Sequence, residues 1–254
     1  MIYFEEKIIR IRYLLSAQPL VAQNTDLTPK LSVLPQFENF RLIERSDLCK
    51  IVSSSCATTS YFDPIPTWLL KASLPAVAES LTNIVNLSLV HAAVPKTLKK
   101  AIVCPLRQSK SLSSEELSNY RPVSTLSFFS KILERVVLAQ LEDYLQSNNL
   151  LDRFQSAYRK KCSTETAVLK VQNDILRALD ANKQVVLVLL DLSAAFDTIE
   201  HTSLLHRLSS RVGITGSVLR WISSYLSDRT QQVKISESLS TQSTLKYGVP
   251  QGSV

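Results

Sequence analysis

Asp191 stands at the end of an apolar run, and its carboxylate is the group in this sequence best placed for chemistry. Residues 185–190 are all valine or leucine. Such a run is typical of a central β-strand that is covered on both faces. An aspartate that follows such a strand lies at the rim of the core, where metal ions and phosphates are bound. The pattern therefore predicts a functional Asp191, and the competing interpretation is a carboxylate that caps the next helix.

A glycine-bracketed loop near the end of the sequence is the second candidate. Gly248 and Gly252 enclose the run Val249-Pro250-Gln251. Glycine permits a positive φ and a close approach by a ligand. An ordinary Gly-Pro turn has the same composition, so the loop alone does not separate a binding loop from a turn.

Taken in this order, residues 191–197 and 248–252 resemble motifs A and B of the reverse transcriptases of LINE-type (non-LTR) retrotransposons. Residues 119–137 and 154–167 resemble the fingers segments of that family. Upstream, residues 63–71 resemble the linker that precedes the polymerase in these elements, as residues 4–12 do more weakly. Several motifs in the family's order are a far more specific signal than any one of them.

The resemblance implies nucleotidyl transfer with two Mg²⁺ ions, which activate the attacking oxygen and stabilise the leaving one. Asp191 corresponds to the motif A metal ligand, and the backbone carbonyl of Leu192 would add one oxygen. Phe196 corresponds to the steric-gate aromatic that favours deoxynucleotides, a role compatible with anchoring the turn as a core residue. Gln251 and Gly252 would border the incoming nucleotide and the template base.

The second carboxylate pair of this family is not found in the sequence. In the family, two adjacent aspartates follow motif B, and this sequence contains no Asp-Asp dipeptide. Asp197 is interpreted as a structural or N-cap carboxylate rather than as a second metal ligand. We therefore expect weak or no Mg²⁺ binding and no processive polymerase activity from this chain.

Basic residues in the fingers-like segments are candidates for charge-assisted hydrogen bonds with phosphates. The sequence carries 29 Lys+Arg against 22 Asp+Glu, and the formal net charge of +7 favours polyanionic partners. An ordinary solvated surface would explain any one of these residues equally well. The partners implied by the resemblance are an RNA template, a DNA primer and dNTPs. The candidates are Arg121 and Arg159 for nucleotide binding, and Lys131, Lys160 and Lys161 for nucleic-acid binding.

Composition limits the class of protein. Hydrophobic residues make up 45% of the sequence, which is enough to build a core. The N-terminus is too interrupted by charge for a secretory signal, and no uncharged apolar run is long enough to span a bilayer. The four cysteines show no zinc-ligand spacing. We expect an intracellular protein, in the cytoplasm and nucleus, that is neither secreted nor membrane-bound.

Hydrophobic periodicity predicts an α+β fold, which the resemblance refines to the fingers and partial palm of a right-hand polymerase without a thumb. Helices are predicted around residues 8–15, as two or three segments within 68–95, at 132–145, at 168–179 after a Ser163 cap, and as a pair within 204–226. Strands are predicted at 101–106, 185–191, 230–235 and 243–247. The expected domains are a partly disordered linker (1–60), upstream helices and fingers (61–183), and a partial palm (184–254).

Three functional hypotheses remain from the sequence. The leading one is a fragment of a retrotransposon RNA-directed DNA polymerase. The alternative is a non-catalytic remnant that binds RNA or an RNA–DNA hybrid. A third, an unrelated α/β phosphotransfer domain, predicts a second acid two residues after Asp191, where the sequence has Ser193.

Overall fold

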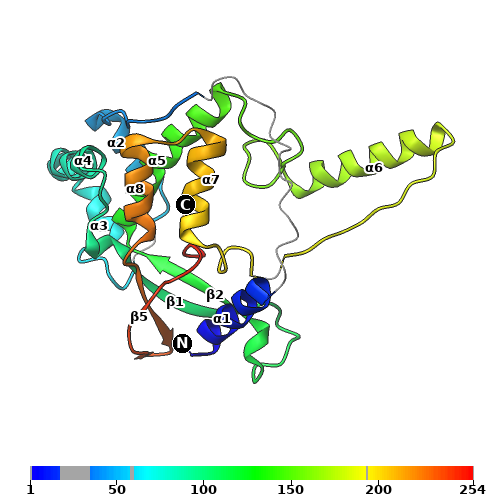
Figure 1. The fold of residues 1–254 in the computed structure, drawn as a ribbon. Coiled ribbons are helices and arrows are strands. Elements are labelled where there is room, and N and C mark those ends of the chain that lie inside the picture. Colours follow the sequence, from blue (N-terminus) through cyan, green and yellow to red (C-terminus); the bar gives the residue numbers. More distant parts are fainter. Residues whose placement is uncertain (1, 18–34, 58–59, 193, 254) are drawn as a thin grey trace. The chain divides into compact units, whose positions relative to one another are not determined.

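The computed structural model describes residues 2–17, 35–57, 60–192 and 194–253. The chain forms two compact units, which are described separately. The first consists of Met1–Tyr144 with Ala194–Val254, and the second of Leu145–Ser193. Figure 1 shows the elements of both units.

A mixed sheet organises the first unit. Its strands are β1 (Lys100–Arg107), β2 (Tyr120–Leu126), β3 (Thr230–Ile235), β4 (Ser238–Leu239) and β5 (Ser243–Thr244). The order is β2-β1-β3-β4, with β5 also paired to β3, and only the β1–β3 pair is parallel. The sheet confirms the strands predicted at 101–106 and 230–235. The strand predicted at 243–247 is real but shorter.

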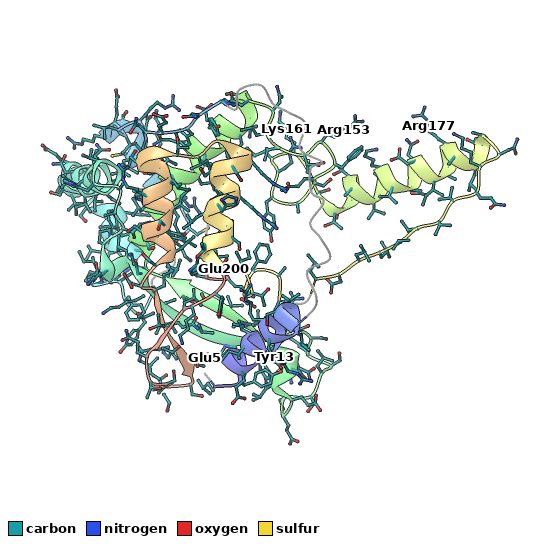
Figure 2. The ribbon with its side chains drawn as sticks, viewed as in Figure 1. Glu5, Tyr13, Arg153, Lys161, Arg177 and Glu200 are labelled. Atoms are coloured by element: carbon teal, nitrogen blue, oxygen red, sulfur yellow. The ribbon has the colours of Figure 1, made fainter. Side chains whose placement is uncertain are left out.

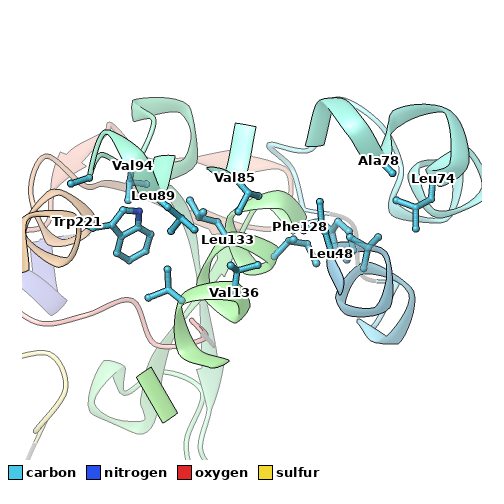
Figure 3. Close-up of a cluster of buried hydrophobic side chains, with 14 residues drawn as sticks. Leu48, Leu74, Ala78, Val85, Leu89, Val94, Phe128, Leu133, Val136 and Trp221 are labelled. Atoms are coloured by element: carbon cyan, nitrogen blue, oxygen red, sulfur yellow. The ribbon is translucent and has the colours of Figure 1, made fainter. Parts of the chain in front are cut away.

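Helices of the first unit build its core. They are α1 (Ile2–Ala17), α2 (Arg45–Ser54), α3 (Thr67–Ala72), α4 (Leu74–Val90), α5 (Phe128–Ser147), α7 (His201–Val212) and α8 (Gly216–Leu226), with short 3₁₀ turns at Lys96–Lys99 and Leu117–Asn119. Buried side chains of α2, α4, α5 and α8 interlock in one apolar cluster (Figure 3). Leu48, Val85 and Ile132 in this cluster are fully buried. These contacts hold α2, α4, α5 and α8 together.

Asp63 gives the linker-like motif at residues 63–71 a structural role. One carboxylate oxygen accepts a hydrogen bond from the backbone N–H of Phe128 at 2.8 Å. The other accepts from the N–H of Ser60 at 2.5 Å. Phe128 is the first residue of α5, so Asp63 caps this helix from a distant point in the sequence.

Residues 35–39 pack along the turn between α7 and α8, and Arg41 and Ile43 bond to α5 and α4, contacts that the sequence did not predict. Phe37 donates its N–H to the carbonyl of Gly213 at 2.9 Å and accepts from the N–H of Thr215 at 3.1 Å. The Tyr144 hydroxyl lies 2.7 Å from the carbonyl oxygen of Pro35. With α2, this segment shows that much of the described part of residues 1–60 belongs to the folded first unit.

The second unit contains α6 (Thr164–Asp180), which is capped by Ser163 as predicted. The Ser163 hydroxyl accepts from the N–H of Thr166 at 3.2 Å, and the Thr166 hydroxyl accepts from the N–H of Ser163 at 2.9 Å. These reciprocal bonds form a capping box that satisfies two backbone donors.

The strand predicted at residues 185–191 is not formed, and this prediction was wrong. Residues 183–192 have no regular secondary structure, and Val186 and Leu190 are 85% and 90% exposed. An apolar run becomes a strand only when a neighbouring strand supplies hydrogen bonds and another layer covers its faces. None of the strands in the described residues pairs with this run. Asp191 is therefore not held at a sheet edge here.

None of the helices in the described parts of the chain is both long enough and apolar enough to cross a membrane.

Candidate functional site

The motif B loop packs on residues 196–199, which are the end of motif A and the turn after it, within the first unit. Gly248 donates its N–H to the carbonyl of Ile199 at 2.7 Å, and Val249 donates to the carbonyl of Phe196 at 3.0 Å. Gly248 has φ +75°, and a Cβ there would lie 2.5 Å from the Phe196 carbonyl oxygen and 2.6 Å from Asp197 Cα. Only glycine fits this close approach of two backbones.

Side chains reinforce this junction between residues 196–201 and the motif B loop. Gln251 Nε2 donates to Asp197 Oδ1 at 2.8 Å and to Oδ2 at 2.7 Å. His201 Nε2 lies 2.8 Å from the carbonyl oxygen of Gly248, to which it donates a hydrogen bond. Asp197 thus has the structural role expected for it, although as a partner of Gln251 rather than as a helix cap. No sequence pattern indicated a role for His201.

The carboxyl of Asp197 is half-buried, and its burial raises its pKa. The hydrogen bond from Gln251 and the positive charge of Lys7 act in the opposite direction, because both favour the ionised form. Asp197 is therefore a partly desolvated carboxylate whose ionised form is favoured by one amide donor and by the charge of Lys7.

Strand β2 supplies the third side of the junction. Ser124 on β2 donates its N–H to the carbonyl of Gln251 at 2.6 Å. Gly252 has φ +120°, and a Cβ there would collide with the Ser124 carbonyl oxygen. The fingers-like segment, motif A and motif B therefore meet at one place, although they are far apart in the sequence.

Helix α1 lies against this junction. Arg12 Nη1 donates to the carbonyl of Thr198 at 3.4 Å, and its guanidinium carbon lies 4.8 Å from the centre of the Tyr247 ring. Phe4 and Ile8 line a cavity of about 30 Å³ together with Asp197, Gln251 and residues of β1 and β2. This volume has room for an ordered water but not for a nucleotide.

The proposed metal ligands lie in the other unit. Asp191 and Leu192 belong to the second unit and are exposed, whereas Phe196, which is 46% exposed, belongs to the first. Across the described residues, no three His, Cys, Asp or Glu side chains gather in a way that could hold a metal ion. Asp191 alone offers fewer ligands than Mg²⁺ requires from a protein and its substrate. Asp191 and Leu192 therefore do not by themselves form a Mg²⁺ site.

The predicted basic residues are divided between the two units. Arg121 is exposed on β2 and Lys131 is half-buried on α5, both in the first unit. The other three lie in the second unit, on the loop before α6. There the Arg159 guanidinium donates to the carbonyl of Asp152 at 3.0 Å. Figure 2 shows Arg153 and Lys161 on this loop and Arg177 on α6 itself.

Glu200 caps α7, the helix that begins with His201 (Figure 2). Its carboxylate accepts from the Ser203 hydroxyl at 2.5 Å and from the Ser203 N–H at 2.7 Å. These bonds, with one from Thr202, lower the pKa of Glu200 to about 2. The cap of α7 is therefore strongest while Glu200 is ionised.

We expect Glu200→Gln to lower the free energy of unfolding by about 0.5–1 kcal/mol at neutral pH, the usual range for an exposed helix cap. The folded pKa lies below the unfolded value of 4.5. The stabilisation is therefore complete above pH 4.5 and is lost as the pH falls towards 2. Urea unfolding of both proteins at neutral and acidic pH measures the difference. A difference that grows on acidification would contradict this assignment.

Comparisons with known proteins agree with the family resemblance of the motifs. A family model described as reverse transcriptase (RNA-dependent DNA polymerase) matches residues 105–254. The chain is 30% identical over 177 residues to a probable RNA-directed DNA polymerase from transposon BS of Drosophila melanogaster, a match that covers 67% of this chain and 19% of the relative.

Two further relatives give similar values. An RNA-directed DNA polymerase from mobile element jockey of Drosophila melanogaster is 29% identical over 160 residues, which are 63% of this chain and 17% of that protein. A retrovirus-related Pol polyprotein from type-1 retrotransposable element R2 of Popillia japonica is 28% identical over 173 residues, with 67% of this chain and 23% of the relative covered. The chain spans about a fifth of the length of these relatives.

Proposed function

The chain belongs to the reverse transcriptase (RNA-dependent DNA polymerase) family, and on this premise we propose that it serves as part of an RNA-directed DNA polymerase of a LINE-type retrotransposon. The observation that carries the proposal is the junction in the first unit. There the motif B loop binds the end of motif A through Gln251 and the turn after it through Gly248, beside β2 of the fingers-like segment. This contact joins the parts of the sequence that resemble the family.

The roles that we propose for the segments and residues follow the sequence motifs. Residues 61–183 would form the fingers-like part and residues 184–254 part of the palm, and the partners would be an RNA template, a DNA primer and dNTPs. In the complete polymerase Asp191 and the carbonyl of Leu192 would bind Mg²⁺, which supplies charge stabilisation at the transferred phosphate. Phe196 would exclude the ribose 2′-hydroxyl. The nucleotide would be bordered by Gln251, Gly252, Arg121 and Arg159, and the nucleic-acid backbone by Lys131, Lys160 and Lys161.

A second candidate function is binding of RNA or an RNA–DNA hybrid without chemistry. It is favoured by the basic loop before α6, where exposed Lys160 and Lys161 follow Arg159. Phosphate contacts of this kind need no metal and depend strongly on salt.

One binding experiment tests both candidates. We expect the chain to bind a primed RNA template. In the triple variant Arg159→Ala/Lys160→Ala/Lys161→Ala, the slope of log K against the logarithm of the salt concentration should become shallower by about two to three, since three phosphate contacts are lost. Asp191→Ala should bind as the unchanged chain does. Fluorescence anisotropy over a salt series measures these constants, and primer extension on the same template tests for chemistry.

The matched control removes three positive charges elsewhere, through Lys50→Ala, Lys110→Ala and Arg220→Ala. All three side chains are exposed in the first unit. If this control weakens binding as much as the loop variant does, the loop has no specific role and net charge explains the affinity. If the unchanged chain does not bind the primed template, the proposed function is wrong.

A further inference from the structure

We propose that Asp197 is a positioning residue that fixes the orientation of the Gln251 carboxamide in the motif B loop. Both carboxylate oxygens of Asp197 accept from the same amide nitrogen, at 2.8 and 2.7 Å. The relevance of this orientation to an incoming nucleotide rests on the proposed function. The coupling between the two side chains does not, because it is a property of the folded first unit.

The chemistry of the pair permits one orientation of the amide. A carboxylate can only accept hydrogen bonds, so the NH₂ group of Gln251 must face Asp197 and the carbonyl oxygen Oε1 must face away. Rotating the amide by half a turn would place Oε1 against two other acceptors with no proton between them. Partial burial of Asp197 increases the cost of that arrangement, because water screens and replaces the lost hydrogen bonds less well than at a fully exposed site.

The backbones on both sides hold the pair in register. Phe196 and Ile199, which flank Asp197 in the sequence, accept hydrogen bonds from the motif B loop at 3.0 and 2.7 Å. Gln251 is fixed in turn by its carbonyl, which accepts from Ser124 at 2.6 Å. With both main chains fixed, the side chains meet without a large entropic cost. The Oε1 of Gln251 is therefore held as a hydrogen-bond acceptor on the side of the amide away from Asp197.

Helix α1 supplies the electrostatic partner of this pair. The charge of Lys7 favours the ionised form of Asp197. Phe4 and Ile8, on the same helix, line the small cavity beside the two side chains. An ionised acceptor next to an apolar wall is the state that holds the Gln251 amide in one orientation.

A donor–acceptor exchange tests the proposal on the full chain. In Gln251→Glu, two carboxylates face each other, and we expect the amides of Gly248 and Val249 to exchange hydrogen about tenfold faster, the effect of losing one half-buried hydrogen-bonded pair. In the double variant Asp197→Asn/Gln251→Glu, the donor lies on residue 197 and the acceptor on residue 251. Exchange should then return to within about threefold of the unchanged chain. Hydrogen exchange monitored by NMR gives these rates.

A spectroscopic signature separates positioning from mere stabilisation. In the unchanged chain, the Gln251 side-chain NH₂ should give two widely separated, slowly exchanging proton resonances, which move towards the values of a free amide in Asp197→Asn. His201→Ala is the structural control, because His201 binds the Gly248 carbonyl and not Gln251. It should speed exchange in the loop and leave the Gln251 NH₂ resonances in place.

Two results would overturn the proposal. One is a double variant that exchanges as fast as Gln251→Glu, which would mean that the two side chains are not coupled. The other is an unchanged Gln251 NH₂ signal in Asp197→Asn. Neither result bears on binding of the primed template, so failure of this inference and failure of the proposed function are distinguishable.

Discussion

Gly248→Ala is expected to lower the free energy of unfolding by about 2–4 kcal/mol and to separate the motif B loop from motif A. The new Cβ would lie 2.5 Å from the Phe196 carbonyl oxygen and 2.6 Å from Asp197 Cα. Both are backbone atoms, which cannot rotate away as a side chain does. The loop would have to shift, and the hydrogen bond from the Val249 N–H to the Phe196 carbonyl would break. Urea unfolding gives the change in the free energy of unfolding. Faster hydrogen exchange at the Val249 amide reports the loss of its hydrogen bond.

The control is Gly248→Asn, which distinguishes steric contact from backbone strain. Asparagine tolerates positive φ better than alanine, but it carries the same Cβ. If contact with the motif A backbone dominates, both variants are destabilised to a similar extent. A Gly248→Ala variant within about 0.5 kcal/mol of the unchanged chain would show that the loop is not seated as described.

Trp221→Ala is expected to cost about 3–5 kcal/mol, the range for removing a large buried aromatic side chain. Trp221 on α8 is 3% exposed and lies in the apolar cluster of the first unit (Figure 3). Its ring stacks on Tyr225 with centres 5.6 Å apart, and its Nε1 donates to Ser88 Oγ at 3.0 Å. The substitution leaves a cavity at the contact between α4 and α8 and leaves Ser88 without this donor.

The other tryptophan provides a matched control. Trp68 on α3 is 65% exposed, so Trp68→Ala should change the free energy of unfolding by no more than about 0.5 kcal/mol. Urea unfolding followed by circular dichroism measures both variants without depending on tryptophan fluorescence. Similar losses in the two variants would contradict the location of the core.

Local signals in the sequence were sufficient for most of the elements. The Ser163 cap and the apolar periodicity of residues 168–179 predicted α6, because a capping box and a helical face involve only neighbouring residues. The positions of Gly213 and Gly216 likewise predicted the break between α7 and α8. The order of the motifs also indicated the family, as the match over residues 105–254 shows.

Contacts between distant residues were not predictable in this way. Helix α2 and the segment 35–43 were not predicted. Nothing in a proline-containing polar stretch indicates that the Phe37 N–H will donate to the carbonyl of Gly213. The partnership of Asp197 with Gln251 was missed for the same reason. The run at 185–191 was assigned to a strand because its composition suits one, yet pairing depends on neighbours that composition does not reveal.

The sequence by itself thus determined the family, the mixed α and β content and the residues available for chemistry, because these depend on residue type, order and short-range spacing. Tertiary structure alone decided which of those residues meet. It brought Asp197, Gln251 and β2 together in one junction and left the apolar run before Asp191 without a strand partner. The physical reason is that a strand edge, a half-buried carboxylate and a glycine-only contact are each completed by atoms from a remote part of the chain.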